Sequence, residues 1–285
     1  MKVTAMTSVA AWTAEKMRCG KLLFLVVTIA FGCSTPTAAD QRTFSILDNT
    51  RIEAGLSHGQ PYQFAMVSGF TRRGELAQRF EIRHGDCGGT RGWDDCSNDR
   101  GRVERKERPK NVFSEPGEGI WYGYSIYIPA DFESLGRANT HLSQVKVEGE
   151  GMPLWQLTFN DNPYILYSDD TYCSLGSMAM WRGGWNDVTV YAHYGEGGEG
   201  VYFQLYRNGV LLCERNRPLM HPSMWGRDQQ IGFKYGIYNS FVSRYLRSYD
   251  RLPTHVILYD EMLAGSRRED VDVRMREAAG LPPVD

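Results

Sequence analysis

Residues 232–239 read GFKYGIYN, and in this stretch apolar and polar side chains alternate. Successive side chains of a β-strand point to opposite faces of the sheet. One face then carries three side chains that predict a buried core: Phe233, Tyr235 and Ile237. The other face carries Lys234 and Tyr238, with Gly236 between them, which we interpret as room for a ligand. The stretch therefore predicts a strand with one side in the core and the other in a binding site.

Two shorter stretches upstream alternate in the same way. In residues 144–147 (QVKV) the two valines point inward, and Gln144 and Lys146 point outward. In residues 100–106 (RGRVERK) one face carries four polar side chains: Arg100, Arg102, Glu104 and Lys106. Alone, this basic run is typical of a solvated edge strand, whose charges oppose pairing with other chains. Together, three strands that each present an amide, a cation or a phenol predict a groove for an anionic polymer.

Strand and turn signals continue along the chain. Strand-forming residues dominate three stretches: residues 121–128, 187–193 and 255–262. Asn208-Gly209 separates two further alternating runs, and this dipeptide is the strongest short signal for a β-hairpin. About a dozen short strands with such turns predict an all-β fold, a β-jelly roll of two curved sheets with a concave substrate groove.

The first 39 residues predict a secretory signal peptide. Basic residues precede an apolar run, residues 22–31, that is too short to span a bilayer. Small residues follow at 37–39 (TAA), so we expect maturation near Asp40, and Met17 is a candidate for the true start. The alternative is a lipoprotein anchored at Cys33. The mature chain is expected to have no stable membrane span and to be secreted or periplasmic.

The mature chain, residues 40–285, is expected to form a single domain because no linker divides it. From about residue 266 it ends in a charged tail, for which a short helix and a loose segment both remain open. Removal of the leader leaves a net charge of about −5, so we expect no general affinity for polyanions and no nucleic-acid partner.

Four cysteines remain after the leader, and an even number in an exported protein predicts disulfides. Their spacing favours the pairs Cys87–Cys96 and Cys173–Cys213. A zinc site is the alternative, but the sequence contains no CxxC and its six histidines are scattered. Asp94-Asp95 and Asp169-Asp170 could hold a structural calcium ion, with solvated loops as the alternative.

The predicted groove suits the β-elimination of a uronate polymer. The C5 proton beside a uronate carboxylate cannot leave unless that carboxylate is neutralised. Gln144 and Arg102 suit this task, as an amide donor and a forked cation. Tyr238 suits the acid that protonates the departing O4, or both acid and base, with Lys234 lowering the pKa of its phenol. None of these steps requires a metal or another cofactor.

The three stretches, in this order, resemble the signature motifs of the alginate-lyase-like jelly-roll polysaccharide lyases. The family pattern is R(S/T)E, then Q(I/V)H, then YFKxGxYxQ, and this chain has RVE at 102–104, QVK at 144–146 and FKYGIYN at 233–239. The wider context, which includes residues 80–87 and 121–123, is similar to the heparin-lyase-I and glucuronan-lyase branch. The resemblance covers roughly residues 60 to 262.

This resemblance implies roles for particular residues. Arg102 and Gln144 match the neutralisers of the substrate carboxylate, Tyr238 the catalytic tyrosine and Lys234 its accompanying lysine. The family's histidine position holds Lys146, which as a base would need a depressed pKa, so Tyr238 is favoured as combined base and acid. We assign substrate contacts to five further residues: Arg100, Glu104, Lys106, Asn239 and His84. Glu104 could instead orient an arginine.

An imidazole could also reach the groove from another strand. His84 and His141 are the candidates, with a surface histidine as the alternative for each.

The first functional hypothesis is an exported, monomeric lyase that acts on a glucuronan-like, heparin-like or alginate-like polysaccharide. The second is a carbohydrate-binding protein without activity on the same scaffold, for which Lys146 is the main support. A jelly-roll glycoside hydrolase would need a strand with paired carboxylates, which this sequence lacks.

Overall fold

The computed structural model describes residues 42–53, 55–57, 59–108, 113, 117–148, 151–195, 200–221 and 230–285. The expected leader, residues 1–39, lies outside the described residues. Among the described residues, strands dominate and all pairs of named strands are antiparallel. The architecture is the β-jelly roll that the sequence predicted.

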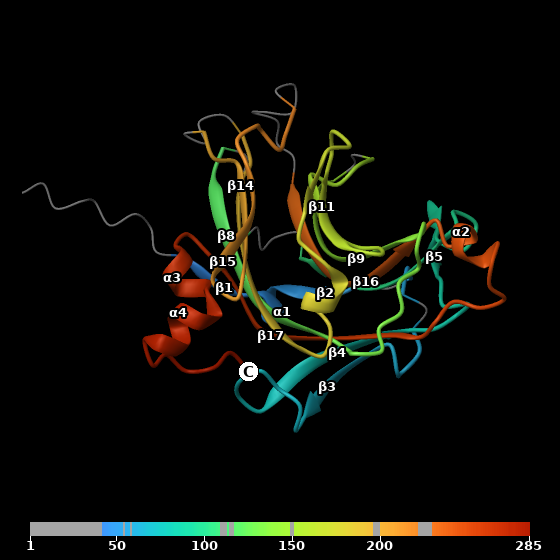
Figure 1. The fold of residues 1–285 in the computed structure, drawn as a ribbon, viewed down its shortest axis with the longest axis horizontal. Helices are drawn as coiled ribbons and strands as arrows, with labels where there is room; N and C mark the ends of the chain where they lie inside the picture. The colour runs from blue at the N-terminus through green and yellow to red at the C-terminus, as the bar shows by residue number, and fades with distance from the viewer. Residues whose placement is uncertain are drawn as a thin grey trace, which may run out of the picture. The chain divides into compact units, whose positions relative to one another are not determined.

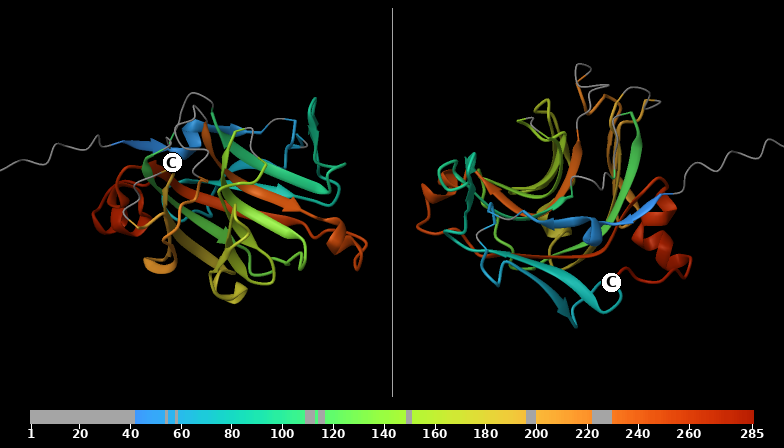
Figure 2. Two further views of the ribbon diagram at one scale, coloured as in Figure 1. Left: turned by 90° about the horizontal axis from the view of Figure 1, so that it is seen from above. Right: turned by 180° about the vertical axis from the view of Figure 1, so that it is seen from behind.

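Two large sheets make up the sandwich. The sheet that carries the predicted site is called the groove sheet, and its strands follow the order β12 (Tyr172–Ser174), β11 (Pro163–Tyr167), β10 (Trp155–Phe159), β9 (Asn139–Val147), β16 (Ile231–Ser240), β7 (Arg100–Glu107) and β2 (Thr50–Ile52). The outer sheet follows the order β15 (Val210–Arg215), β14 (Phe203–Arg207), β13 (Gly184–His193), β8 (Gly119–Ile128), β17 (His255–Gly265), β4 (Leu76–Ile82) and β3 (Phe64–Ser68), with β1 (Thr43–Ser45) on β17. Both sheets bend in the same direction, and the groove sheet lies inside the curve of the outer sheet (Figures 1 and 2).

Smaller elements join or flank the sheets. A two-stranded ribbon and a few one-turn or two-turn helices complete the described fold: β5 (Gly89–Thr90), β6 (Trp93–Asp94), α1 (Ile46–Asn49), the 3₁₀ turn Met178–Met180, α2 (Ser243–Leu246), α3 (Arg268–Val271) and α4 (Val273–Ala278). β5 and α2 lie at the same end of the groove sheet (Figure 1), where Ser243 donates two hydrogen bonds to Asp99. No helix among the described residues is long and apolar enough to cross a membrane.

Strand β16 confirms the alternation predicted for it. Three of its side chains are fully buried between the sheets: Phe233, Tyr235 and Ile237. Phe233 stacks on Tyr122 of the outer sheet with ring centroids 4.8 Å apart. Burial of each large apolar side chain stabilises the fold by about 1.5–3 kcal/mol. The packing of these side chains turns the opposite face of β16 toward the groove.

Gly236 has another purpose than the one predicted. Its φ is +132°, and a Cβ at this position would lie 2.3 Å from the carbonyl oxygen of Val103 and 3.1 Å from Phe80. The glycine therefore allows β16 to lie close to β7 where the ladder between β16 and β9 is irregular, and the interpretation that it leaves room for a ligand was wrong.

Both predicted disulfides are present. Cys87–Cys96 closes the loop that carries the β5–β6 ribbon, and Cys173–Cys213 joins β12 of the groove sheet to β15 of the outer sheet. The predicted hairpin is also confirmed, because Asn208 and Gly209 connect β14 to β15 with φ angles of 51° and 82°. Positive φ at both positions is what a type I′ turn requires.

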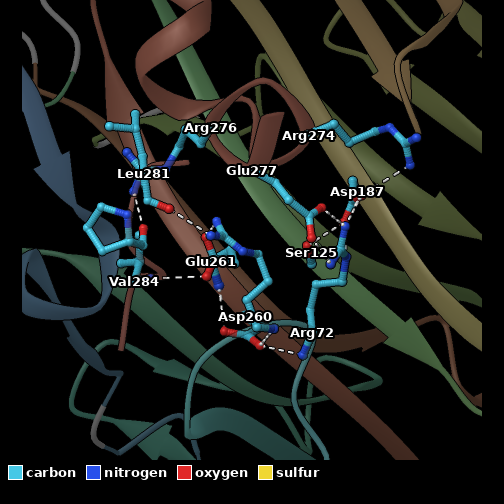
Figure 3. Close-up of polar contacts among 12 residues, drawn as sticks. Arg72, Ser125, Asp187, Asp260, Glu261, Arg274, Arg276, Glu277, Leu281 and Val284 are labelled. Atoms are coloured by element: carbon cyan, nitrogen blue, oxygen red, sulfur yellow. Dashed lines mark hydrogen bonds and ion pairs between the residues drawn. The ribbon is translucent and has the colours of Figure 1, made fainter. Parts of the chain in front are cut away.

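The C-terminal tail forms α3 and α4 and then continues along the outer sheet. Figure 3 shows that Arg72 bridges the outer sheet and the tail, because it forms ion pairs with Asp187 of β13 at 3.0 Å and with Glu277 of α4 at 2.7 Å. Farther along, the backbone N–H of Val284 donates to Glu261 of β17 at 3.0 Å. Of the two forms left open for the tail, the structure has short helices.

Candidate active site

A groove of about 840 Å³ lies on the exposed face of the groove sheet, above β7, β9 and β16. It brings together seven of the residues predicted from the sequence: Arg100, Arg102, Lys106, Gln144, Lys146, Lys234 and Tyr238. The ladder explains why, because β16 pairs with β7 on one side and with β9 on the other. The three stretches singled out by their alternation are therefore neighbouring strands of one sheet.

Tyr238 lies between two arginines from β7. Its hydroxyl accepts a hydrogen bond from Nε of Arg100 at 2.7 Å, and the guanidinium of Arg102 lies 4.2 Å from the ring centroid. Burial raises the pKa of Tyr238, although the charges of Arg102 and Arg100 act in the opposite direction. The phenol is therefore protonated near neutral pH.

Lys234 does not act on this phenol in the way the sequence suggested. Its ammonium group binds the carboxylate of Glu53 at 2.8 and 3.1 Å. Lys234 instead holds Glu53 at the edge of the groove, and this carboxylate has its pKa lowered by Lys234 and Arg102 despite its burial. The cations beside the phenol are the two arginines of β7.

His141 faces Tyr238 directly across the ladder between β9 and β16. The ring centroids are 5.3 Å apart, and the imidazole is 4% exposed, so the interpretation of this residue as a surface histidine was wrong. Its Nδ1 lies 2.9 Å from Oγ1 of Thr158 and its Nε2 lies 3.1 Å from Oγ of Ser240. Burial, together with the nearby Arg100, lowers the pKa of His141 to about 3, so the imidazole is neutral.

Lys146 occupies a different part of the groove. It pairs with Gly232, which precedes Tyr238 by six residues, or roughly 20 Å of extended strand. Burial and the charge of Lys234 lower the pKa of Lys146. The structure therefore places Lys146 in the groove but does not bring it next to Tyr238, where the imidazole of His141 lies instead.

Arg102 and Gln144 are held by buried carboxylates. Arg102 makes two hydrogen bonds to Asp95, at 2.6 and 2.8 Å, and a third to Glu104 at 3.3 Å. Nε2 of Gln144 donates to Glu104 at 2.6 Å, and Oε1 of Gln144 accepts from Gln156 at 3.3 Å. Burial raises the pKa of Glu104, which is 1% exposed. Glu104 thus orients both groups, as its alternative interpretation proposed.

The remaining predicted contacts are distributed differently. Lys106 lines the groove and binds Glu148. The structure does not bring Asn239 or His84 into the groove lining. Asn239 is buried on the opposite face of β16, where its Oδ1 accepts from Thr140 at 2.9 Å, and the exposed His84 accepts from the backbone N–H of Leu252 at 3.3 Å.

The sequence pattern of the family described as polysaccharide lyase matches residues 40–263. The chain belongs to this family. The protein is a polysaccharide lyase, and the groove on β7, β9 and β16 is its candidate active site.

Solved structures with a related fold have low sequence identity to this lyase. The family 7 alginate lyase A1-II′, solved with a bound GGMG substrate, is 15% identical, with 74% of this chain and 84% of that chain covered at a TM-score of 0.48. An alginate lyase from Pseudomonas aeruginosa is 15% identical, with coverages of 67% and 83% and a TM-score of 0.46. The cellulose-induced protein Cip1 is 12% identical, with coverages of 78% and 93% and a TM-score of 0.49. None of the curated proteins shows significant sequence similarity to the chain.

The lyase groove also contains residues that the sequence did not single out. The indole of Trp93 is 42% exposed at the groove, and its Nε1 donates to Asp95 at 2.7 Å. Ser240 and Glu53 are further lining residues. Trp93 lies on the short β5–β6 ribbon, where a single exposed aromatic residue carries no periodic signal that would have identified it.

In the described part of the lyase, no cluster of three or more His, Cys, Asp or Glu side chains could hold a metal ion. The two aspartate pairs considered for calcium serve other contacts. Asp95 binds Arg102, and Asp169 binds Arg215 at 2.9 Å. A structural calcium site therefore stays a prediction that these contacts do not favour.

Proposed function

We propose that this lyase cleaves a uronate-containing polysaccharide by β-elimination in the groove. The observation that carries the proposal is the position of the Tyr238 hydroxyl, which Arg100 binds at 2.7 Å beside the neutral imidazole of His141. A phenol that only packs in a sandwich does not need a cation and an imidazole on the solvent side of a sheet.

The reaction makes three demands on the groove. The substrate carboxylate must be neutralised, a base must take the C5 proton, and an acid must protonate O4. The C5–H bond then breaks, its electron pair forms the C4–C5 double bond, and the C4–O4 bond breaks as O4 gains a proton. Arg100 suits the first task best, because among the described residues no carboxylate lies within ion-pair distance of it, whereas Arg102 already binds Asp95 and Glu104.

We assign the acid to Tyr238 and the base to His141. Burial raises the pKa of Tyr238, which favours the protonated form that an acid needs. Burial lowers the pKa of His141, so its imidazole is neutral and has a free lone pair, and we propose that the anionic substrate stabilises the imidazolium that forms. The proton acceptor in this assignment is Nε2, which lies 3.1 Å from the hydroxyl of Ser240. This assignment differs from the sequence-based interpretation of Tyr238 as both acid and base, and the two give different results when His141 is replaced.

We further propose that the lyase works outside the cytoplasm as a monomer and without a cofactor, on a glucuronate-rich polymer such as glucuronan. Two disulfides are expected of an oxidising compartment. The family match begins at residue 40, directly after the expected leader. The charge that develops on the substrate is met by guanidinium and amide groups, so we expect full activity in the presence of EDTA.

The test is ultraviolet absorbance of unsaturated uronate during incubation with glucuronan, alginate, heparin, heparan sulfate, hyaluronan and pectate. We expect a rise on at least one polymer, and a fall in kcat of about 10²–10⁴-fold in both Tyr238→Phe and His141→Asn. Tyr127→Phe, on β8 of the outer sheet, is the matched control and should keep its activity. If His141→Asn keeps full activity while Tyr238→Phe is inactive, Tyr238 acts as both the base and the acid. No rise with any polymer would overturn the proposal.

A further inference from the structure

A second cavity, of about 560 Å³, opens beside the end of the groove sheet that carries α2. It is lined by three exposed arginines and a serine: Arg137, Arg244, Arg247 and Ser248. Arg137 lies in the loop that leads into β9, and the two other arginines lie on α2 or at its end. The mechanism proposed for the groove assigns no role to these four residues.

Among the residues that the structure describes, the three arginines have no acidic partner. Within the described residues, no carboxylate lies within 4.0 Å of a guanidinium nitrogen of Arg137, Arg244 or Arg247. Two acids that contact this segment bind hydroxyl groups instead: Asp99 accepts from Ser243, and Glu133 accepts from Tyr245 at 2.5 Å. Three like charges gathered at one cavity without counter-charges create a local field that attracts anions.

The segment that carries these arginines is held in place. Tyr245 is buried in a small hydrophobic cluster with Leu135 and Ala138, which is separate from the main core. Ser243 binds Asp99, and Nη1 of Arg244 donates to the carbonyl oxygen of Arg137 at 3.4 Å. The cavity is therefore lined by guanidinium groups on an anchored segment, which lowers the entropic cost of binding a ligand.

Phe241 connects this cavity to the groove. Its ring lines the groove and lies 5.2 Å from the guanidinium of Arg100, and the guanidinium of Arg244 lies 4.1 Å from the same ring. Phe241 directly follows the last residue of β16 and lies three residues after Tyr238. An extended polymer whose reacting sugar lies at Tyr238 can therefore continue past Phe241 to the arginines.

Among the described residues, three of the five Lys and Arg side chains that line the groove are already paired with carboxylates, which leaves Arg100 and Lys146 to attract a polymer. Lys234 binds Glu53, Lys106 binds Glu148, and Arg102 binds Asp95 and Glu104. We propose that the arginine cavity is an accessory subsite that binds anionic groups of the same polymer beyond the reacting sugar. This inference rests on the proposed function, because it takes the anionic polymer of the groove as its ligand.

The test compares a long polymer with a short oligosaccharide that fills only the groove. For the double variant R137A/R247A we expect KM to rise about fivefold on the long polymer, with kcat unchanged and with KM for the short substrate unchanged. Arg267→Ala, an exposed arginine beside α3, is the control for the loss of one charge and should have no effect. Equal KM values for variant and wild type on the long polymer would overturn the inference, as would an equal rise on both substrates.

A binding measurement separates this inference from the proposed function. Wild type and R137A/R247A are run in native gels that contain glucuronan or heparin, and their retardation is compared. Weaker retardation of the variant supports the subsite even if no polymer is cleaved, and equal retardation in both gels overturns it. An effect in the glucuronan gel identifies carboxylates as the bound groups, whereas an effect in the heparin gel alone identifies sulfates.

Discussion

Asp95 is the residue whose replacement would test most directly how the site is built. Its carboxylate is fully buried and makes hydrogen bonds of 2.6 and 2.8 Å to Arg102, which is itself 7% exposed. Loss of one partner of a buried ion pair costs about 3–5 kcal/mol, because the remaining charge stays without compensation. Glu104 still contacts Arg102 in the variant, at 3.3 Å, so we expect Asp95→Asn to lower the free energy of unfolding by about 3 kcal/mol.

We expect the Asp95→Asn replacement to lower the rate of catalysis as well. The guanidinium of Arg102 lies 4.2 Å from the ring of Tyr238, and without Asp95 it can turn away from this position. A displacement of this kind at a reacting group costs about a hundredfold in rate. We therefore expect kcat for polymer cleavage to fall by about that factor, with a smaller change in KM.

The measurements are urea unfolding followed by tryptophan fluorescence, and initial rates by ultraviolet absorbance. Asp94→Asn is the matched control, because Asp94 lies in the same loop, is exposed, and accepts a hydrogen bond from the backbone of Ser97 that asparagine can also accept. We expect this control to stay within about 0.5 kcal/mol of the wild type. If Asp95→Asn is no less stable and no slower than Asp94→Asn, the buried pair does not hold the site and the reasoning is refuted.

Two further predictions concern the fold beneath the groove. Burial raises the pKa of Glu107 to about 7 although two backbone N–H groups donate to it, so the contribution of Glu107 to stability is complete below pH 4.5 and is lost as the pH rises to about 7. In urea unfolding, the stability advantage of the wild type over Glu107→Gln should shrink by about 3 kcal/mol between these pH values. A stability difference that does not change with pH would contradict this assignment. Gly236→Ala should lower the free energy of unfolding by about 3 kcal/mol or more, because its Cβ would lie 2.3 Å from the carbonyl oxygen of Val103. Gly232→Ala, whose Cβ has no neighbour closer than 3.7 Å, should cost much less, and equal losses would exclude the steric explanation.

Features that depend on the local period of the sequence were predicted correctly. The burial of Phe233 and Ile237 follows from alternation alone, and so does the position of Lys234 and Tyr238 on the groove face of β16. The hairpin at residues 208–209 was predictable because its turn needs two residues that tolerate positive φ. In each case the physical cause lies within a few residues, where a single sequence can reveal it.

Contacts between distant segments could not be predicted in this way. The partner of Lys234 is Glu53, which is 181 residues away in sequence, and no local pattern connects the two. The partner of Arg102 is Asp95, which the sequence offered only as part of a solvated or calcium-binding loop. Both partners are set by strand order and by the disulfide-closed loop, which are properties of the whole fold.

The position of His141 depends on an irregularity rather than on the period. His141 and Gln144 are three residues apart, so a regular strand would place them on opposite faces. Register shifts opposite Leu142 of β9, seen against both β10 and β16, put the two side chains on the same face. One extra residue in one strand is what re-aims a side chain beside a functional site. Gly236, at φ +132°, lies in the same irregular stretch of β16 and allows the close approach to β7. The pairing of phenol and imidazole that supports the acid and base assignments therefore comes from the part of the ladder where alternation fails. The family motif placed Lys146 at the histidine position, and alternation alone could not show that His141 shares the groove face with Gln144.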